Sequence, residues 1–168
     1  MIVEIRRDQL PACLDILHRS YEPVALRFGL TRENCPHRGG ADLPLEVLAG
    51  EFDAGAMLYG YFVEGGLVGL VSMSKRDEAL KINDIVVLPE CQGRGIGGAL
   101  LDFVKRAAKD QGADKVMLGM IDDNTALKRW YEVHGFTTVG MRNFEGAPFT
   151  VGYMEWDGER QGAPRGPV

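Results

Sequence analysis

The chain has 168 residues, of which 45% are hydrophobic and 26% charged, values that are ordinary for a soluble globular protein. The formal net charge of −5 at pH 7 disfavours nonspecific binding of nucleic acid, so we expect no nucleic-acid partner. No apolar run reaches transmembrane length and no secretory leader is recognisable, so we expect no membrane partner and a cytoplasmic protein.

The first half of the chain is predicted to form a strand, two helices and a hairpin. Residues 2–6 are strand-like, and Asp8 is expected to cap a helix whose apolar residues keep helical spacing as far as Tyr21. We expect a loop over 22–41, with a helical turn near Leu26. A second helix is predicted at 43–49, between Asp42 as cap and Gly50 as stop, and a hairpin at 57–64 and 67–75.

A strand and a glycine-rich turn follow, in the sequence INDIVVLPECQGRGIGGALL at 82–101. The strand at 82–88 is rich in β-branched residues and is closed by Pro89. The next helix places Leu100, Val104 and Ala108 on one face. Glycines let a ligand approach the backbone, and the first turn of a helix has unpaired N–H groups. The turn is therefore expected to bind a phosphate or pyrophosphate.

Several classes of site share this pattern. A P-loop is excluded because no Gly-Lys-Ser/Thr follows the glycines. Gly93, Gly95 and Gly98 match the dinucleotide pattern G-x-G-x-x-G, but four residues separate the strand from the first glycine. A turn without any ligand is the remaining structural alternative. The run from Gln92 to Gly97 also fits the pattern Gln/Arg-x-x-Gly-x-Gly/Ala at every position.

A second motif lies downstream, after a predicted strand at 115–121. The segment from Asn124 through Tyr131 to Gly135-Phe136 resembles the signature Asn-x-x-Ala-x-x-x-Tyr-x-x-x-Gly-Phe, with Leu127 at the alanine position. With the glycine turn, this pair of motifs resembles the GNAT family of acetyltransferases over roughly residues 1–156. Further elements are predicted as a helix at 125–134 and strands at 137–143 and 149–156.

The resemblance implies a single α+β domain at 1–156. Its central sheet would be mixed and mostly antiparallel, flanked by helices and splayed at the coenzyme site. Residues 157–168, which contain glycine and proline but no large apolar residue, are expected to form a disordered tail. Many members of the family pair, so a homodimer is compatible with the resemblance, although no feature of this sequence indicates one.

The implied activity is transfer of an acetyl group from acetyl-CoA to a primary amine of a small molecule or protein, by direct attack in a ternary complex and without a metal. One alternative is a coenzyme A binding module without catalysis, acting as a sensor or partner protein. Another is a nucleotide-binding oxidoreductase, which would need an acidic residue closing a second parallel strand about twenty residues past the glycines. Asp114 is the nearest acidic residue, but it precedes its strand.

The resemblance also assigns roles to residues. Tyr131 is the expected general acid for the departing thiolate, and Asn124 would bind the coenzyme or cap its helix. Asp84 is the acidic candidate for the general base, because Gly119 stands where some members carry a glutamate. Deprotonation through water remains the alternative. The expected coenzyme-binding residues are Ile85, Val86, Val87, Gln92, Gly93, Arg94, Gly95, Ile96, Gly97, Gly98 and Asn124.

The acceptor amine would bind beside Tyr21, Glu22 and the irregular segment at 28–42, which the resemblance places on the acceptor side. The net acidity of the chain mildly favours a cationic acceptor, such as a polyamine, an aminoglycoside or a lysine side chain.

Overall fold

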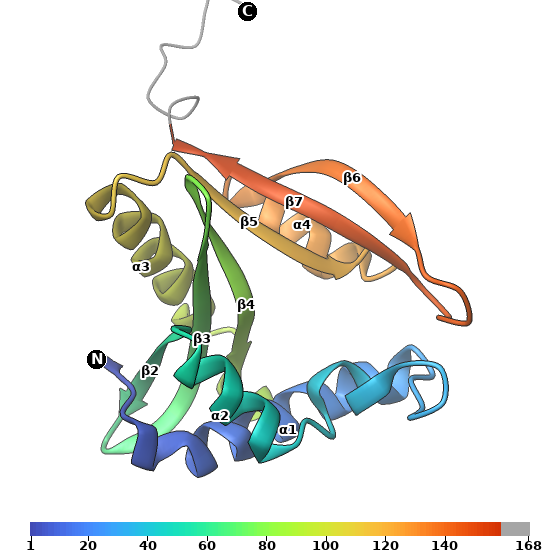
Figure 1. Ribbon diagram of the computed structural model, residues 1–168, viewed down its shortest axis with the longest axis horizontal. Coiled ribbons are helices and arrows are strands. Elements are labelled where there is room, and N and C mark those ends of the chain that lie inside the picture. The colour runs from blue at the N-terminus through green and yellow to red at the C-terminus, as the bar shows by residue number, and fades with distance from the viewer. Residues whose placement is uncertain (159–168) are drawn as a thin grey trace, which may run out of the picture.

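The computed structural model describes residues 1–158, and its strands form one twisted sheet with helices on both faces (Figure 1). The strands are β1 (Ile2–Glu4), β2 (Met57–Val63), β3 (Gly66–Arg76), β4 (Ala79–Val87), β5 (Lys115–Ile121), β6 (Thr137–Asn143) and β7 (Thr150–Asp157). The helices are α1 (Leu10–Arg27), α2 (Leu45–Asp53), α3 (Ile96–Asp110) and α4 (Thr125–Val133), with short 3₁₀ turns η1 (Arg7–Gln9), η2 (Pro36–Gly40) and η3 (Pro89–Cys91).

The sheet has the strand order β1-β2-β3-β4-β5-β7-β6, and every pair is antiparallel except β4 with β5. That parallel pair is short, because only Ala79–Lys81 of β4 pair with Lys115–Met117 of β5. Beyond these residues the two strands diverge (Figure 1). The predicted fold class, a mixed and mostly antiparallel sheet flanked by helices, is confirmed.

The two faces of the sheet bury separate apolar clusters. On one face, α3 packs with Leu100, Val104 and Ala108 fully buried, as its spacing predicted. On the other face, α1 and α2 cover the sheet with residues such as Leu17 and Leu48. Burial of large aliphatic side chains, at about 1.5–3 kcal/mol each, holds both helical layers to the sheet.

A β-bulge in β4 decides which residues face which layer. Ser72 of β3 pairs with Asp84 and Met73 pairs with Ile82, so Asn83 is an extra residue in β4. The side chain of Asn83 donates to the hydroxyl of Ser74 at 2.8 Å. Bulges reverse the alternation of a strand, and here Ile82 packs against the α3 layer whereas Val86 packs against the α1 layer. The bulge therefore places Asp84 on the α1 side.

Several predicted boundaries were wrong near the N-terminus. Helix α1 continues through Pro23 to Arg27, where a loop was expected, because Ala25 remains fully buried on its core face. Asp8 lies inside η1 and caps no helix. Helix α2 starts at Leu45 and runs past Gly50, so Asp42 is not its cap.

The C-terminal prediction is tested only in part. Asp157 belongs to β7, whereas residues 159–168 of the expected disordered tail lie outside the described residues. Within residues 1–158, no helix combines the length and the apolarity that a bilayer crossing requires.

Candidate active site

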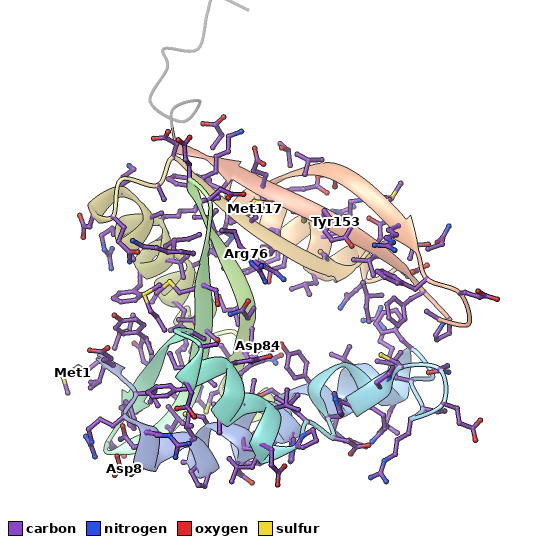
Figure 2. All side chains as sticks on the ribbon, in the orientation of Figure 1. Met1, Asp8, Arg76, Asp84, Met117 and Tyr153 are labelled. Carbon is purple, nitrogen blue, oxygen red and sulfur yellow. The ribbon has the colours of Figure 1, made fainter. Side chains whose placement is uncertain are left out.

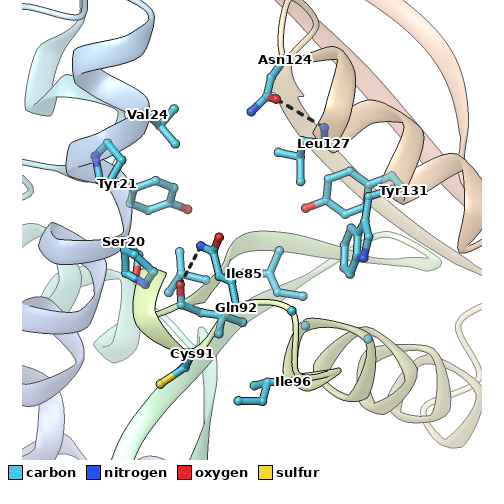
Figure 3. Close-up of a pocket in the computed structure, with 18 of the residues that line it drawn as sticks. Ser20, Tyr21, Val24, Ile85, Cys91, Gln92, Ile96, Asn124, Leu127 and Tyr131 are labelled. Atoms are coloured by element: carbon cyan, nitrogen blue, oxygen red, sulfur yellow. Dashed lines mark hydrogen bonds between the residues drawn. The ribbon is translucent and has the colours of Figure 1, made fainter.

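A cavity of about 610 Å³ opens where β4 and β5 diverge, between α1, the glycine turn and α4 (Figure 3). The structure brings most of the predicted site residues together in its wall. Those that line it are Ile85, Val86, Val87, Gln92, Gly93, Gly95, Ile96, Gly97, Gly98, Asn124 and Tyr131. Arg94 is not part of this wall, and Asp84 lines a neighbouring cavity instead.

The glycine turn has the backbone that the sequence suggested. Gly93 and Gly95 have φ of +76° and +82°, a left-handed conformation that a residue with a Cβ adopts at a cost. Gly95 is the N-cap residue of α3, and no side chain caps this helix. The first N–H groups of α3 therefore point out of the helix unpaired, beside the positive end of its dipole. This arrangement suits a phosphate group.

Gly97 also lies in close contact with α4. A Cβ at this position would lie 3.3 Å from Cζ2 of Trp130, which is tighter than an ordinary contact. The glycine lets the first turn of α3 approach α4 closely, so that both helices line one cavity. Trp130 lines the cavity as well, although no sequence motif marked it as a wall residue.

The end of β4 supplies backbone groups to the same cavity. In the described part of the chain, pairing with β5 is confined to Ala79–Lys81, so the β5-facing edge of Ile85–Val87 has no strand partner. A ligand that carries amide groups can pair with such an edge as an added strand does. Gln92 Nε2 donates to Val87 O at 3.2 Å and fixes the turn against the strand (Figure 3).

Two residues of the second motif face the cavity from α4 and its N-terminus. Asn124 caps α4, because its Oδ1 accepts a hydrogen bond from Leu127 N at 3.3 Å. Asn124 also lines the cavity. Tyr131 is 5% exposed and packs edge-on against Phe136. Its hydroxyl makes no hydrogen bond within residues 1–158, and burial raises the pKa of this phenol well above its ordinary value. Tyr131 is therefore a protonated donor at neutral pH.

Asp84 and Tyr21 form a hydrogen-bonded pair, in which the tyrosine hydroxyl donates to the carboxylate at 2.8 Å. Burial raises the pKa of Asp84, against the opposing effects of the Tyr21 hydrogen bond and of Lys81. The pKa of Glu51 on α2 is also raised, by burial and then by the charge of Asp84. Figure 2 shows Asp84 where β4 passes α1 and α2. A carboxyl group with a raised pKa is better suited to accept a proton than an ordinary one.

The hydroxyls of Tyr21 and Tyr131 point toward each other from opposite sides of the cavity (Figure 3). A second cavity of about 260 Å³ begins at these residues and extends toward Asp84 and Gly119. Tyr21, Ile85 and Tyr131 line both cavities, so the two spaces meet between α1 and α4. Two ligands, one bound in each cavity, would therefore be in reach of the same side chains.

Two wall residues on α1 had no signal in the sequence. The hydroxyl of Ser20 is buried in the cavity wall and has no hydrogen-bond partner among residues 1–158, which is rare for a buried polar group. Arg27 adds a cationic side chain at the C-terminus of α1. Arg27 reaches the cavity because α1 extends beyond Tyr21, where a loop was predicted.

The guanidinium of Arg94 is exposed and donates to Glu90 O at 3.3 Å. Its expected contact with a phosphate stays a prediction. Among residues 1–158, no group of three or more His, Cys, Asp or Glu side chains is arranged to hold a metal ion.

Comparison with known proteins agrees with this geometry. The model of the acetyltransferase (GNAT) family matches residues 13–136. The chain therefore belongs to the GNAT family.

Relatives and solved structures show the reach of this similarity. An uncharacterized N-acetyltransferase of Mycobacterium tuberculosis is 32% identical over 82 residues, which are 48% of this chain and 53% of the relative. The chain thus spans about half the length of the curated relatives it matches.

Two solved structures cover nearly the whole fold at 17% identity. The ribosomal-protein-S18-alanine N-acetyltransferase of Escherichia coli has a TM-score of 0.76 over 94% of this chain and 92% of its own. The PaiA N-acetyltransferase of Thermoplasma acidophilum, in complex with coenzyme A, has a TM-score of 0.70 over 94% and 98%.

Proposed function

We propose that the chain is an N-acetyltransferase that moves an acetyl group from acetyl-CoA to a primary amine by direct attack in a ternary complex. The observation that carries the proposal is the composition of one cavity wall. It combines uncapped N–H groups at α3, an unpaired edge of β4 and the buried hydroxyl of Tyr131. We propose residues 1–156 as the acetyltransferase domain.

For the acyl donor, the pyrophosphate would bind the N–H groups between Gly93 and Gly98. The pantetheine amides would pair with the β5-facing edge of Ile85–Val87, beside the Val87 carbonyl that already accepts from Gln92. The unpartnered hydroxyl of Ser20 supports a polar ligand in this cavity. Backbone groups would supply most of these contacts, so plain hydrophobic side chains at β4 are compatible with binding.

For the chemistry, an ammonium acceptor would first lose a proton to Asp84. The neutral nitrogen would then attack the thioester carbonyl, forming the C–N bond. The C–S bond would break as Tyr131 protonates the thiolate, and the second nitrogen proton would leave as the amide forms and the phenol is restored through solvent. One ammonium and one thioester thus give one amide, one free thiol and one released proton.

The proposal is tested by incubating the protein with acetyl-CoA and a panel of primary amines. We expect amine-dependent release of free thiol and an acetylated amine identified by mass spectrometry. A protein that binds acetyl-CoA but acetylates no amine of the panel would favour the coenzyme-binding module over the enzyme.

A further inference from the structure

We propose that the 260 Å³ cavity receives a small primary monoamine with a compact apolar substituent, an inference that rests on the proposed function. The cavity lies next to the coenzyme cavity and shares Tyr21, Ile85 and Tyr131 with it. An amine nitrogen at this junction would lie close to both Asp84 and the expected position of the thioester. The substituent of the amine would then extend into the smaller cavity.

The walls of this cavity are mostly apolar. They include Leu30, Ile82, Leu118, Met120, Ile121 and Phe149. The volume is below the roughly 300–1,000 Å³ of pockets that hold drug-sized ligands. An aliphatic or aromatic group of modest size would be desolvated favourably here, whereas a hydroxyl-rich or branched polar group would lose its water without replacement.

The charge of the lining fits one ammonium group. Asp84 and Arg38 are its two charged side chains. Arg38 is already neutralised, because its guanidinium donates to both carboxylate oxygens of Glu22 at 3.0 and 3.1 Å and lies 3.6 Å from Asp42. Asp84 has only the hydroxyl of Tyr21 as a direct partner among residues 1–158. It is therefore the carboxylate that a cationic acceptor would meet.

A second positive charge on the acceptor would find no partner in the lining. It would be removed from water against a mostly apolar wall. Polyamines and aminoglycosides are therefore disfavoured. This differs from the preference that the net charge of −5 indicated, because the local wall and not the global charge decides binding in a cavity.

The outer side of the cavity is closed by contact between distant segments. Leu30 and Ala41, from the connection between α1 and α2, are buried in a cluster against which Ile121 and Phe149 pack. In Figure 1 the connection between α1 and α2 lies below the tip of the β6–β7 hairpin. A polypeptide acceptor would have to separate this cluster, so a free small amine is the better fit.

Gly119 offers a way to change the volume of the cavity. It lines the cavity on β5, and a Cβ there would meet Tyr153 and Val151 at 3.6 Å, an ordinary contact. Gly119 is exposed, so Gly119→Val should fold and add an aliphatic side chain at one residue of the cavity lining. Gly140→Val is a matched control. Gly140 also lies in a strand, and a Cβ there would be 4.0 Å from Cδ2 of Tyr153. Gly140 does not line the cavity.

The test is calorimetric titration of amines into the full chain saturated with coenzyme A. We expect 2-phenylethylamine to bind at least about tenfold more tightly than spermidine or trialanine. Gly119→Val should weaken its binding by about tenfold or more, while Gly140→Val leaves it unchanged and both variants keep their affinity for acetyl-CoA. Gly119→Glu, which adds a second carboxylate, should improve spermidine relative to 2-phenylethylamine.

Tighter binding of spermidine or trialanine to the unmodified chain would overturn the inference, as would equal affinities of Gly119→Val and Gly140→Val for 2-phenylethylamine. These failures are distinct from failure of the proposed function. Thiol release with spermidine as acceptor would keep acetyl transfer and remove only the apolar acceptor. Absence of acetyl-CoA binding would remove the proposed function itself.

Discussion

The most informative substitution is Tyr131→Phe, which removes a single oxygen atom. The hydroxyl has no hydrogen-bond partner within residues 1–158, and the ring stays packed with its centroid 5.6 Å from that of Phe136. The free energy of unfolding should therefore change by less than about 1 kcal/mol. Loss of a general acid typically slows a reaction about 100- to 10,000-fold, which corresponds to about 2.7–5.4 kcal/mol of transition-state stabilisation.

The assay should isolate the chemical step. We propose single-turnover thiol release with saturating acetyl-CoA and amine, because a slow product release would hide the effect in steady state. Tyr153→Phe is the matched control, since that ring is 36% exposed on the open face of β7 (Figure 2). Its single-turnover rate should equal that of the unmodified chain.

The pH profile provides a second readout. A general acid works while protonated, so activity is lost as pH rises through its pKa. Because burial raises the pKa of Tyr131 above the ordinary 10, this loss should not begin at pH 9 or below. A Tyr131→Phe rate within about threefold of the unmodified chain, across this pH range, would refute the assignment of Tyr131 as the acid.

Three further predictions concern charged groups. Asp84→Asn should slow turnover by about 100-fold or more, because it removes the proton acceptor but keeps an oxygen for the Tyr21 hydroxyl; unchanged turnover would instead indicate proton release to water. The same variant should have a higher free energy of unfolding than the unmodified chain at pH 7. Because the pKa of Asp84 is raised in the native state, ionisation of this carboxyl destabilises the native state as pH rises, and asparagine cannot ionise. The difference in free energy of unfolding between the two proteins, measured by denaturant titration, should therefore shrink as pH falls toward 3.8. Arg94→Ala should weaken acetyl-CoA binding by about 1–3 kcal/mol, since its exposed guanidinium is held by a single carbonyl and can turn to a phosphate; an unchanged dissociation constant in calorimetry would exclude it from the site.

Sequence patterns predicted those parts of the fold that local signals mark. The strands β5 and β6 have the expected bounds, because turn residues mark their ends. Gly112 precedes β5 and Asn124 follows it, and Gly135 precedes β6. The apolar face of α3 was predicted for a similar reason, since a 3.6-residue period over fifteen residues leaves little ambiguity. The two motifs supply many residues of the 610 Å³ cavity wall, and binding of the coenzyme by this wall stays a prediction.

Features that depend on tertiary contacts were not predicted. A loop was expected from residue 22, yet α1 continues through Pro23 because Ala25 is buried against the following loop, and this continuation brings Arg27 to the cavity. Nothing in the alternation of β4 marks Asn83 as the bulged residue, which alone turns Asp84 toward Tyr21. The contact of Gly97 with Trp130 joins two helices that the sequence separates by a strand.

The central claim, that the glycine turn binds acetyl-CoA, is tested most directly by calorimetric titration of acetyl-CoA into the full chain, with NADH as the comparison ligand. Gly95→Val should abolish acetyl-CoA binding. A side chain at this position would strain the backbone at φ +82° and keep the ligand from approaching the backbone of the turn. Gly112→Val carries a similar backbone strain at φ +72° outside the cavity and should retain binding. Saturable binding of acetyl-CoA alone, lost only in Gly95→Val, is the predicted result. Binding of NADH instead, or acetyl-CoA affinity that is indifferent to Gly95, would contradict the account.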